Sequence, residues 1–114
     1  MRVFSSGACR DDDGGKLDFE GYFSPLVMER RARYMFQHGT QADGKRREAD
    51  NWQKGIPLTA YMKSGFRHFF DWWKGHRGLI CQEDLEEALC AVCFNAEGYL
   101  FELLKRRSNA VQDI

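Results

Sequence analysis

The sequence has no net charge and no apolar run long enough to cross a membrane. Its 17 basic residues equal its 17 acidic ones, which argues against a protein that coats a nucleic acid polymer by electrostatic attraction. No stretch approaches the roughly 20 apolar residues of a transmembrane helix, and no apolar signal core follows Met1. We therefore expect a protein that works without a membrane and without a nucleic acid polymer as partner.

Cysteines are few, and their spacing is irregular. The four are Cys9, Cys81, Cys90 and Cys93. Cys90 and Cys93 stand one turn apart in an apolar helical segment, where we expect small core residues. A zinc site would need Cys9 and Cys81 to join them. Reduced thiols in a cytoplasmic protein fit this pattern best.

Strand patterns are absent too, and we expect one all-α domain over residues 1–114. Ser24 and Pro25 predict a helix start, as the N-cap and the first helical residue. This helix should run to about His38 and stop at Gly39.

Two further helices follow from the spacing of apolar residues. One is expected from about residue 58 to 74, ended by Gly75, and the other from about residue 83 to 107. The rest of the chain should be irregular: a polar, glycine-rich arm at 1–24, a long loop at 39–57, and a frayed tail at 108–114.

The helix expected at 58–74 is apolar on more than half of its circumference. Such a helix needs apolar partners on two sides, which a chain of three helices does not supply. We therefore expect a helical bundle completed by association of two or more chains, as a homodimer or homotetramer. The aromatic residues that create this demand are Phe66, Phe69, Phe70, Trp72 and Trp73.

Four side chains that can bind a hard metal ion form two pairs with helical spacing. His68 and Asp71 lie three residues apart in the second helix, and Asp84 and Glu87 lie three apart in the third. Three residues is close to one turn, so each pair projects from one face. The 12 residues between the pairs allow antiparallel helices on which they converge. Such pairs also coat ordinary solvated helices, but the apolar neighbours favour a site for Mg²⁺ or Mn²⁺, because buried acids are costly unless paired.

The loop at 39–57 carries three consecutive cations and Trp52. Cations suit phosphate, an aromatic plane suits a base, and the amide of Asn51 suits the base edge. Trp52 could instead only pin the loop to the core. In the first helix, Glu29 is either a partner for nearby arginines or a further metal ligand. In the arm, Lys16 follows a glycine-rich turn and could hold phosphate, or could lie on a plain surface segment.

The third helix resembles the second half of the MazG-type all-α nucleotide pyrophosphohydrolases. Their signature is E-x-x-E followed by E-x-x-D and an apolar run. Asp84 and Glu87 stand where E-x-x-D would be, with the acids exchanged, and the apolar run through Asn95 follows in register. His68 and Asp71 stand where E-x-x-E would be. Because His68 replaces an acid there, it is either a ligand or a residue that orients water or phosphate.

A closer resemblance covers most of the chain. The segments that carry it are Gly15-Lys16, Ser24-Pro25, Asp50-Asn51-Trp52-Gln53-Lys54-Gly55, Arg67-His68 and Trp72-Trp73-Lys74-Gly75. In this order they are similar to small bacterial and phage dATP/dGTP diphosphohydrolases. The resemblance implies hydrolysis of purine deoxynucleoside triphosphates to monophosphate and pyrophosphate in nucleotide-pool remodelling, in the host cytoplasm if the chain is of phage origin.

The resemblance also implies roles for individual residues. Two or more Mg²⁺ or Mn²⁺ ions would be held by Asp71, Asp84, Glu87 and Glu29, and a metal-bound hydroxide would attack the α-phosphorus. His68 would support this chemistry. Substrate contacts would come from Lys16, Asn51, Trp52, Lys54, Arg67 and Asn95.

Two other classes of function stay open. One is a histidine–aspartate phosphohydrolase that releases tripolyphosphate, but it needs an adjacent His-Asp pair. None of His38, His68 and His76 is followed by aspartate. The other is a non-enzymatic helical module that binds another protein, in which the acid pairs would have no catalytic use.

Overall fold

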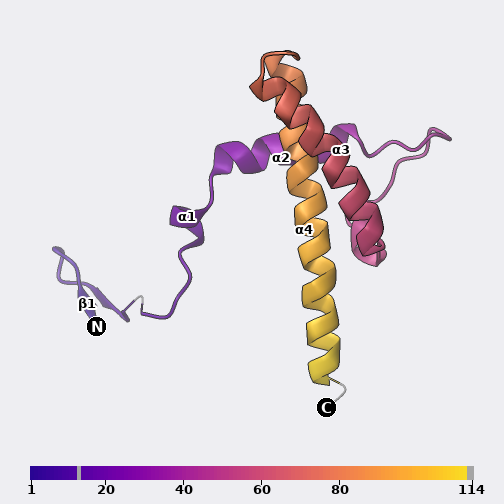
Figure 1. The fold of residues 1–114 in the computed structure, drawn as a ribbon. Helices are drawn as coiled ribbons and strands as arrows, with labels where there is room; N and C mark the ends of the chain where they lie inside the picture. Colours follow the sequence, from indigo (N-terminus) through magenta and orange to yellow (C-terminus); the bar gives the residue numbers. More distant parts are fainter. Residues whose placement is uncertain (13, 113–114) are drawn as a thin grey trace.

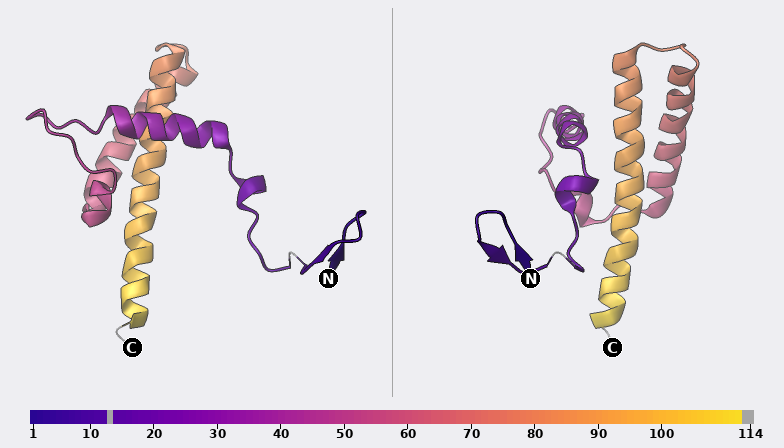
Figure 2. Two further views of the ribbon diagram at one scale, coloured as in Figure 1. Left: turned by 180° about the vertical axis from the view of Figure 1, so that it is seen from behind. Right: turned by 90° about the vertical axis from the view of Figure 1, so that its left-hand side faces the viewer.

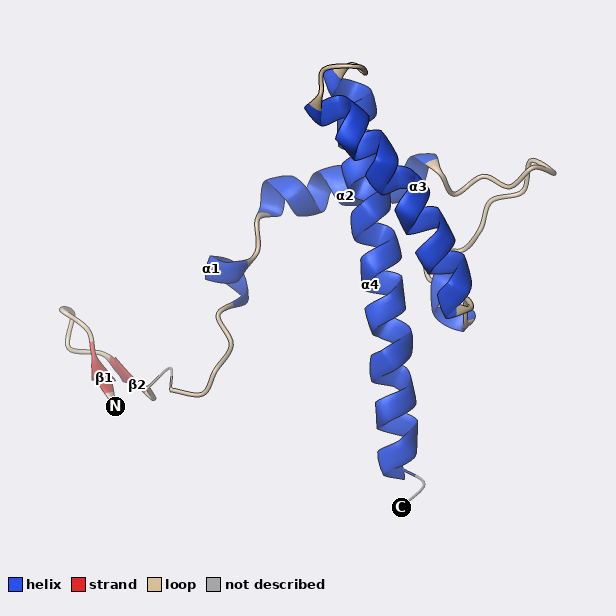
Figure 3. Cartoon of the chain, viewed as in Figure 1, coloured by secondary structure: helices blue, strands red, loops and turns tan. Residues whose placement is uncertain are grey.

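The computed structural model describes residues 1–12 and 14–112 and is mostly helical (Figures 1 and 3). Along the chain, the secondary-structure elements are β1 (Arg2–Val3), β2 (Cys9–Arg10), α1 (Phe19–Tyr22), α2 (Pro25–Gln37), the 3₁₀ turn η1 (Asn51–Lys54), α3 (Leu58–His76) and α4 (Gln82–Gln112). None of the helices in these ranges is both long and apolar enough to cross a membrane.

The centre of the fold is an antiparallel hairpin of α3 and α4, seen side-on in the right view of Figure 2. Close approach of the two helices depends on glycine. A Cβ on Gly98 would lie 2.3 Å from the ring of Tyr61, and one on Gly75 would lie 2.6 Å from Leu85. The buried apolar residues lie on these two helices: Tyr61, Ala88, Cys90 and Ala91. The core is therefore one helix pair and is small.

Helix α2 crosses α4, as the left view of Figure 2 shows. The predicted start is confirmed, because the Oγ of Ser24 accepts a hydrogen bond from the amide of Val27 at 3.3 Å and Pro25 is the first helical residue. Helix α2 has no buried residue. Tyr34 and Met35 are half-buried, so the apolar contact of this helix with the rest of the chain is limited.

The expectation of an arm without secondary structure was wrong in two places. Strands β1 and β2 pair in an antiparallel hairpin, with Arg2 opposite Arg10, around a turn in which Gly7 has φ +92°. Asp18 caps α1 by accepting a hydrogen bond from the amide of Gly21 at 2.8 Å. Two-residue strands are too short to show an alternating pattern, which is why the sequence did not reveal them.

Two predicted helix ends were also misplaced. Helix α3 continues through Gly75 to His76, because Gly75 serves the close approach to Leu85 and does not end the helix. Helix α4 continues beyond Ser108 to Gln112, where a frayed tail was expected. No glycine or proline follows Gly98, so nothing in this stretch breaks the helix.

The chain leaves much apolar surface uncovered. Its radius of gyration is 19.3 Å, against about 13 Å for a compact domain of this length. Its accessible surface is 9502 Å², against roughly 6,500 Å² for a compact monomer of the same mass. The extended arm accounts for part of the excess. The aromatic face of α3 accounts for another part, since Phe66, Phe69, Phe70 and Trp73 are all more than half exposed.

We predict that Gly98→Ala destabilises the protein by about 1–3 kcal/mol, because the added methyl collides with the Tyr61 ring inside the hairpin. Gly65→Ala is the matched control on the other helix, where a Cβ would lie 3.3 Å from Asn95. Its small clash is offset by the better helix propensity of alanine. Urea unfolding of both variants measures the difference, and equal effects would contradict this account of the hairpin.

Candidate functional site

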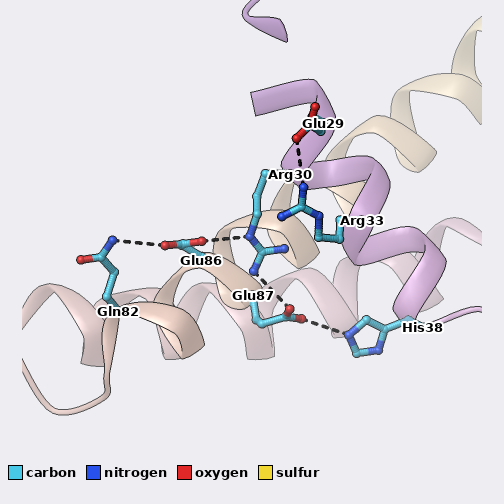
Figure 4. Close-up of polar contacts among 7 residues, drawn as sticks. All are labelled: Glu29, Arg30, Arg33, His38, Gln82, Glu86 and Glu87. Carbon is cyan, nitrogen blue, oxygen red and sulfur yellow. Dashed lines mark hydrogen bonds and ion pairs between the residues drawn. The ribbon is translucent and has the colours of Figure 1, made fainter. Parts of the chain in front are cut away.

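The arginine on the second turn of α2 joins that helix to α4 (Figure 4). The Nε of Arg30 lies 2.9 Å from Oε1 of Glu86, and its Nη2 lies 3.2 Å from Oε1 of Glu87. The other oxygen of Glu87 lies 3.0 Å from Nε2 of His38, at the end of α2. Arg31 pairs with Glu97, which lies further along α4. Glu87 therefore has both carboxylate oxygens engaged.

The charges in this network stabilise one another. The hydrogen bond from Arg30 is the main cause that lowers the pKa of Glu86. Burial by itself would raise the pKa of Glu87, but the hydrogen bonds from His38 and Arg30 outweigh burial and lower that pKa. The hydrogen bond to Glu86 likewise raises the pKa of Arg30. Both glutamates are therefore carboxylates at neutral pH.

The predicted pair on α3 also lies together. The Nδ1 of His68 is 3.8 Å from Oδ2 of Asp71. Lys74 approaches the other oxygen of Asp71 at 3.6 Å. All three side chains are partly exposed, so water screens these interactions.

The two acid pairs do not converge with Glu29 into one metal site. Among the described residues, no three His, Cys, Asp or Glu side chains gather as metal ligands would. Asp84 is exposed at the start of α4, Glu87 is held by Arg30 and His38, and Glu29 pairs with Arg33 at 2.9 Å. Within one chain these carboxylates do not fit a preformed site for Mg²⁺ or Mn²⁺.

A cavity of about 800 Å³ lies between the end of α2, the 39–57 loop and α4. Ligand pockets in proteins commonly have volumes of roughly 300–1,000 Å³. Its walls combine aromatic rings with a few charged and amide groups. The side chains that matter here are Tyr34, Phe36, His38, Arg46, Arg47, Glu48, Asn51, Trp52 and Phe94.

Trp52 forms a fixed part of this cavity. Its ring packs edge-on with Phe101, at 4.9 Å between centroids, and with Phe94, at 6.3 Å. Both phenylalanines belong to α4, so Trp52 does pin the loop to the helix. It also lines the cavity beside Asn51, so the structural role and the ligand-binding role expected for it are compatible.

Two loop arginines close the cavity by binding the end of α2. The guanidinium of Arg46 lies over the ring of Phe36, 3.9 Å from its centroid, and its Nη2 donates to the Phe36 carbonyl at 2.6 Å. Arg47 donates to the His38 carbonyl at 2.9 Å. The sequence pointed to these cations, but it missed Phe36 and His38. Their position at the helix end, directly before the cationic loop, was the available signal.

The remaining expected substrate residues are dispersed. Lys54 is exposed in η1, and Arg67 is exposed on α3. Lys16 is exposed in the arm, which projects away from the α3–α4 hairpin (Figure 1). Asn95 is buried and donates to the Ala91 carbonyl at 2.8 Å and to the Ser64 hydroxyl at 3.3 Å. Its amide therefore serves the helix hairpin.

A second hollow has a volume of about 530 Å³ and is lined by Arg30, Arg33, Gln37, Gln82, Glu83, Glu86 and Glu87. The aromatic cavity and this charged hollow share no lining residue. They are linked by one contact between their walls, because His38 lines the aromatic cavity and contacts Glu87, which lines the charged hollow.

Comparisons with protein-family models, with curated proteins and with solved structures found no match.

We predict that Arg30→Met lowers the melting temperature at pH 7 by about 2–5 °C, a modest effect because water screens these partly exposed pairs. The folded-state pKa values of Glu86 and Glu87 lie below the ordinary 4.5. The stabilisation is therefore complete above pH 4.5 and is lost as the pH falls through those lowered values. Circular dichroism melts across this range measure the difference between variant and wild type.

Arg33→Met is the matched control, because Arg33 lines the same hollow but pairs within α2, with Glu29. It should leave the melting temperature nearly unchanged. A wild-type advantage over Arg30→Met that persists at low pH would show that Arg30 acts by packing and not by its charge.

Proposed function

We propose that this protein is a nucleotide pyrophosphohydrolase that converts a purine deoxynucleoside triphosphate, dGTP or dATP, to its monophosphate and pyrophosphate. The observation that carries the proposal is the pair of hollows whose walls touch through His38 and Glu87. An elongated ligand with a flat apolar end and a highly charged end needs such a pair of neighbouring environments. The resemblance of the loop and of α3 to dATP/dGTP diphosphohydrolases supports the same substrate.

The cations around this contact suit a triphosphate. Arg47 is held at the His38 carbonyl, which places a guanidinium beside the aromatic cavity. Arg30 and Arg33 line the charged hollow together with Glu83, Glu86 and Glu87, so a triphosphate has to compete with carboxylates for these guanidinium groups. Guanidinium groups bind phosphate oxygens in a bidentate manner, and donors fixed before the ligand arrives stabilise negative charge that develops on it.

The resemblance leads us to expect that turnover requires Mg²⁺ or Mn²⁺. One chain does not gather the expected carboxylates, so we assign no catalytic step to the ion. Of these carboxylates, Glu87 lines the charged hollow, and Asp84 lies about one turn before it at the exposed start of α4. Asp71 and His68 lie on α3, and Glu29 is tied to Arg33.

We also propose that the active unit contains two or more chains. The exposed aromatic residues of α3 form a face that one chain does not cover. Stable homodimers commonly bury 2,000 Å² or more in total, and the excess surface of this chain is of that order. The same face would suit a different protein partner, and it is the observation that favours a non-enzymatic helical module as the second candidate.

We predict that the protein releases pyrophosphate from dGTP or dATP in the presence of Mg²⁺ or Mn²⁺, faster than from dCTP or dTTP. Asp84→Asn should lower kcat at least about 100-fold without unfolding the protein, because Asp84 is exposed and buried packing is unaffected. Glu20→Gln, the same loss of charge on the exposed helix α1 and outside both hollows, is the control and should stay within about threefold.

The products separate the candidate functions. Tripolyphosphate and a nucleoside would identify the other phosphohydrolase class. No turnover with any of the four substrates and either ion would reject catalysis and leave the interaction module.

We predict that light scattering at micromolar concentration gives a molecular mass of at least two chains. Phe69→Glu should shift the mass towards the monomer. An interface on the α3 face would bury the new carboxylate without an opposite charge to pair with it, which is costly. Leu17→Glu is the control, since Leu17 is also well exposed but lies in the arm. A monomeric wild type with full activity would refute the assembly.

A further inference from the structure

We propose that the purine base of the substrate stacks on Phe36, in the place that the guanidinium of Arg46 now occupies. The choice of ligand rests on the proposed function. The choice of site rests on the cavity wall, where a flat cation already covers a flat ring.

Phe36 is unusual for a ring at the end of an amphipathic helix. Its side chain is 68% exposed, and no ring of the described chain stacks on it. Arg46 alone lies over it, 3.9 Å from the centroid. An exposed cation–π contact is weaker than stacking of a base on an aromatic side chain. Displacement also breaks the hydrogen bond from Nη2 of Arg46 to the Phe36 carbonyl, and a phosphate group that binds the freed guanidinium compensates for this loss. A nucleotide can therefore replace the guanidinium on this ring.

The opposite side of the cavity is rigid and supplies polar groups. Trp52 is held by Phe94 and Phe101 of α4, so it does not need to be ordered when a ligand binds. Asn51 and Glu48 line the same cavity. An amide and a carboxylate offer donors and acceptors to the edge of a purine.

Displacement from Phe36 releases a cation close to the charged part of the ligand. Arg46 belongs to the same loop as Arg47. The guanidinium of Arg47 is bound at the His38 carbonyl. From there the freed guanidinium can bind a phosphate group of the nucleotide. The same side chain then has opposite effects on two ligands: it competes with a bare nucleoside and attracts a nucleotide.

The test measures binding of deoxyguanosine, deoxyadenosine, dGMP and dAMP by calorimetry in EDTA, so that neither metal nor turnover takes part. Phe36→Leu keeps apolar bulk but removes the aromatic plane, and it should weaken the tighter-binding purine nucleotide about tenfold. Phe66→Leu is the control, because Phe66 on α3 is 72% exposed and lies outside the cavity. It should leave the affinity unchanged.

Arg46→Gln separates the two roles of the guanidinium. We expect it to tighten or preserve nucleoside binding while it weakens the monophosphate, so that the affinity ratio of nucleotide to nucleoside falls at least about fivefold. Equal weakening of nucleoside and nucleotide would overturn the displacement of Arg46. Absence of binding by all four ligands, or an unchanged affinity in Phe36→Leu, would overturn the base site.

These outcomes are independent of catalysis. Binding that depends on Phe36, without hydrolysis of dGTP or dATP, would keep the base site and remove the proposed activity. Hydrolysis of dGTP or dATP together with nucleotide binding that Phe36→Leu does not change would keep the proposed activity and remove the base site.

Discussion

Polar contacts between α2 and α4 hold the candidate site together, and Arg30 makes two of them. Arg30 bridges Glu86 and Glu87, and through them it fixes α2 on α4. Helix α2 has no fully buried residue, and its Tyr34 and Met35 are only half-buried, so these ion pairs help to set its position. The loop that follows α2 closes over its end through Arg46 and Arg47. The shape of the aromatic cavity therefore depends on an ion-pair network that water partly screens.

This dependence has a consequence for function. A site held by ion pairs can rearrange when a charged ligand or ion offers those groups other partners, because the net free energy of such pairs is small. Glu87, for which we expect a role at the metal, is at present held by Arg30 and His38. Any metal bound by Glu87 must compete with them. The α3–α4 hairpin, whose contacts are apolar and tight, provides the rigid support against which such a change can occur.

Local features were predictable, and features that depend on tertiary approach were not. The N-cap at Ser24 and the antiparallel α3–α4 pair follow from short-range signals, and the structure confirms both. Gly75 carries the same local signal as a helix end, but its role is set by Leu85 on the neighbouring helix. Arg30 and Glu87 are 57 residues apart, and only the crossing of α2 over α4 brings them together. For the same reason, the loop cations were visible in the sequence, while the wall formed by Phe36 and His38 was not.

The central claim is that the pair of hollows linked through His38 and Glu87 positions a triphosphate for attack by water at the α-phosphorus. Hydrolysis of dGTP by the full chain in ¹⁸O-labelled water, with Mg²⁺ or Mn²⁺, tests it most directly. Mass spectrometry of the products locates the oxygen that water supplied. The account predicts one ¹⁸O atom in dGMP and none in pyrophosphate. Label in pyrophosphate, release of orthophosphate, or no reaction would contradict it.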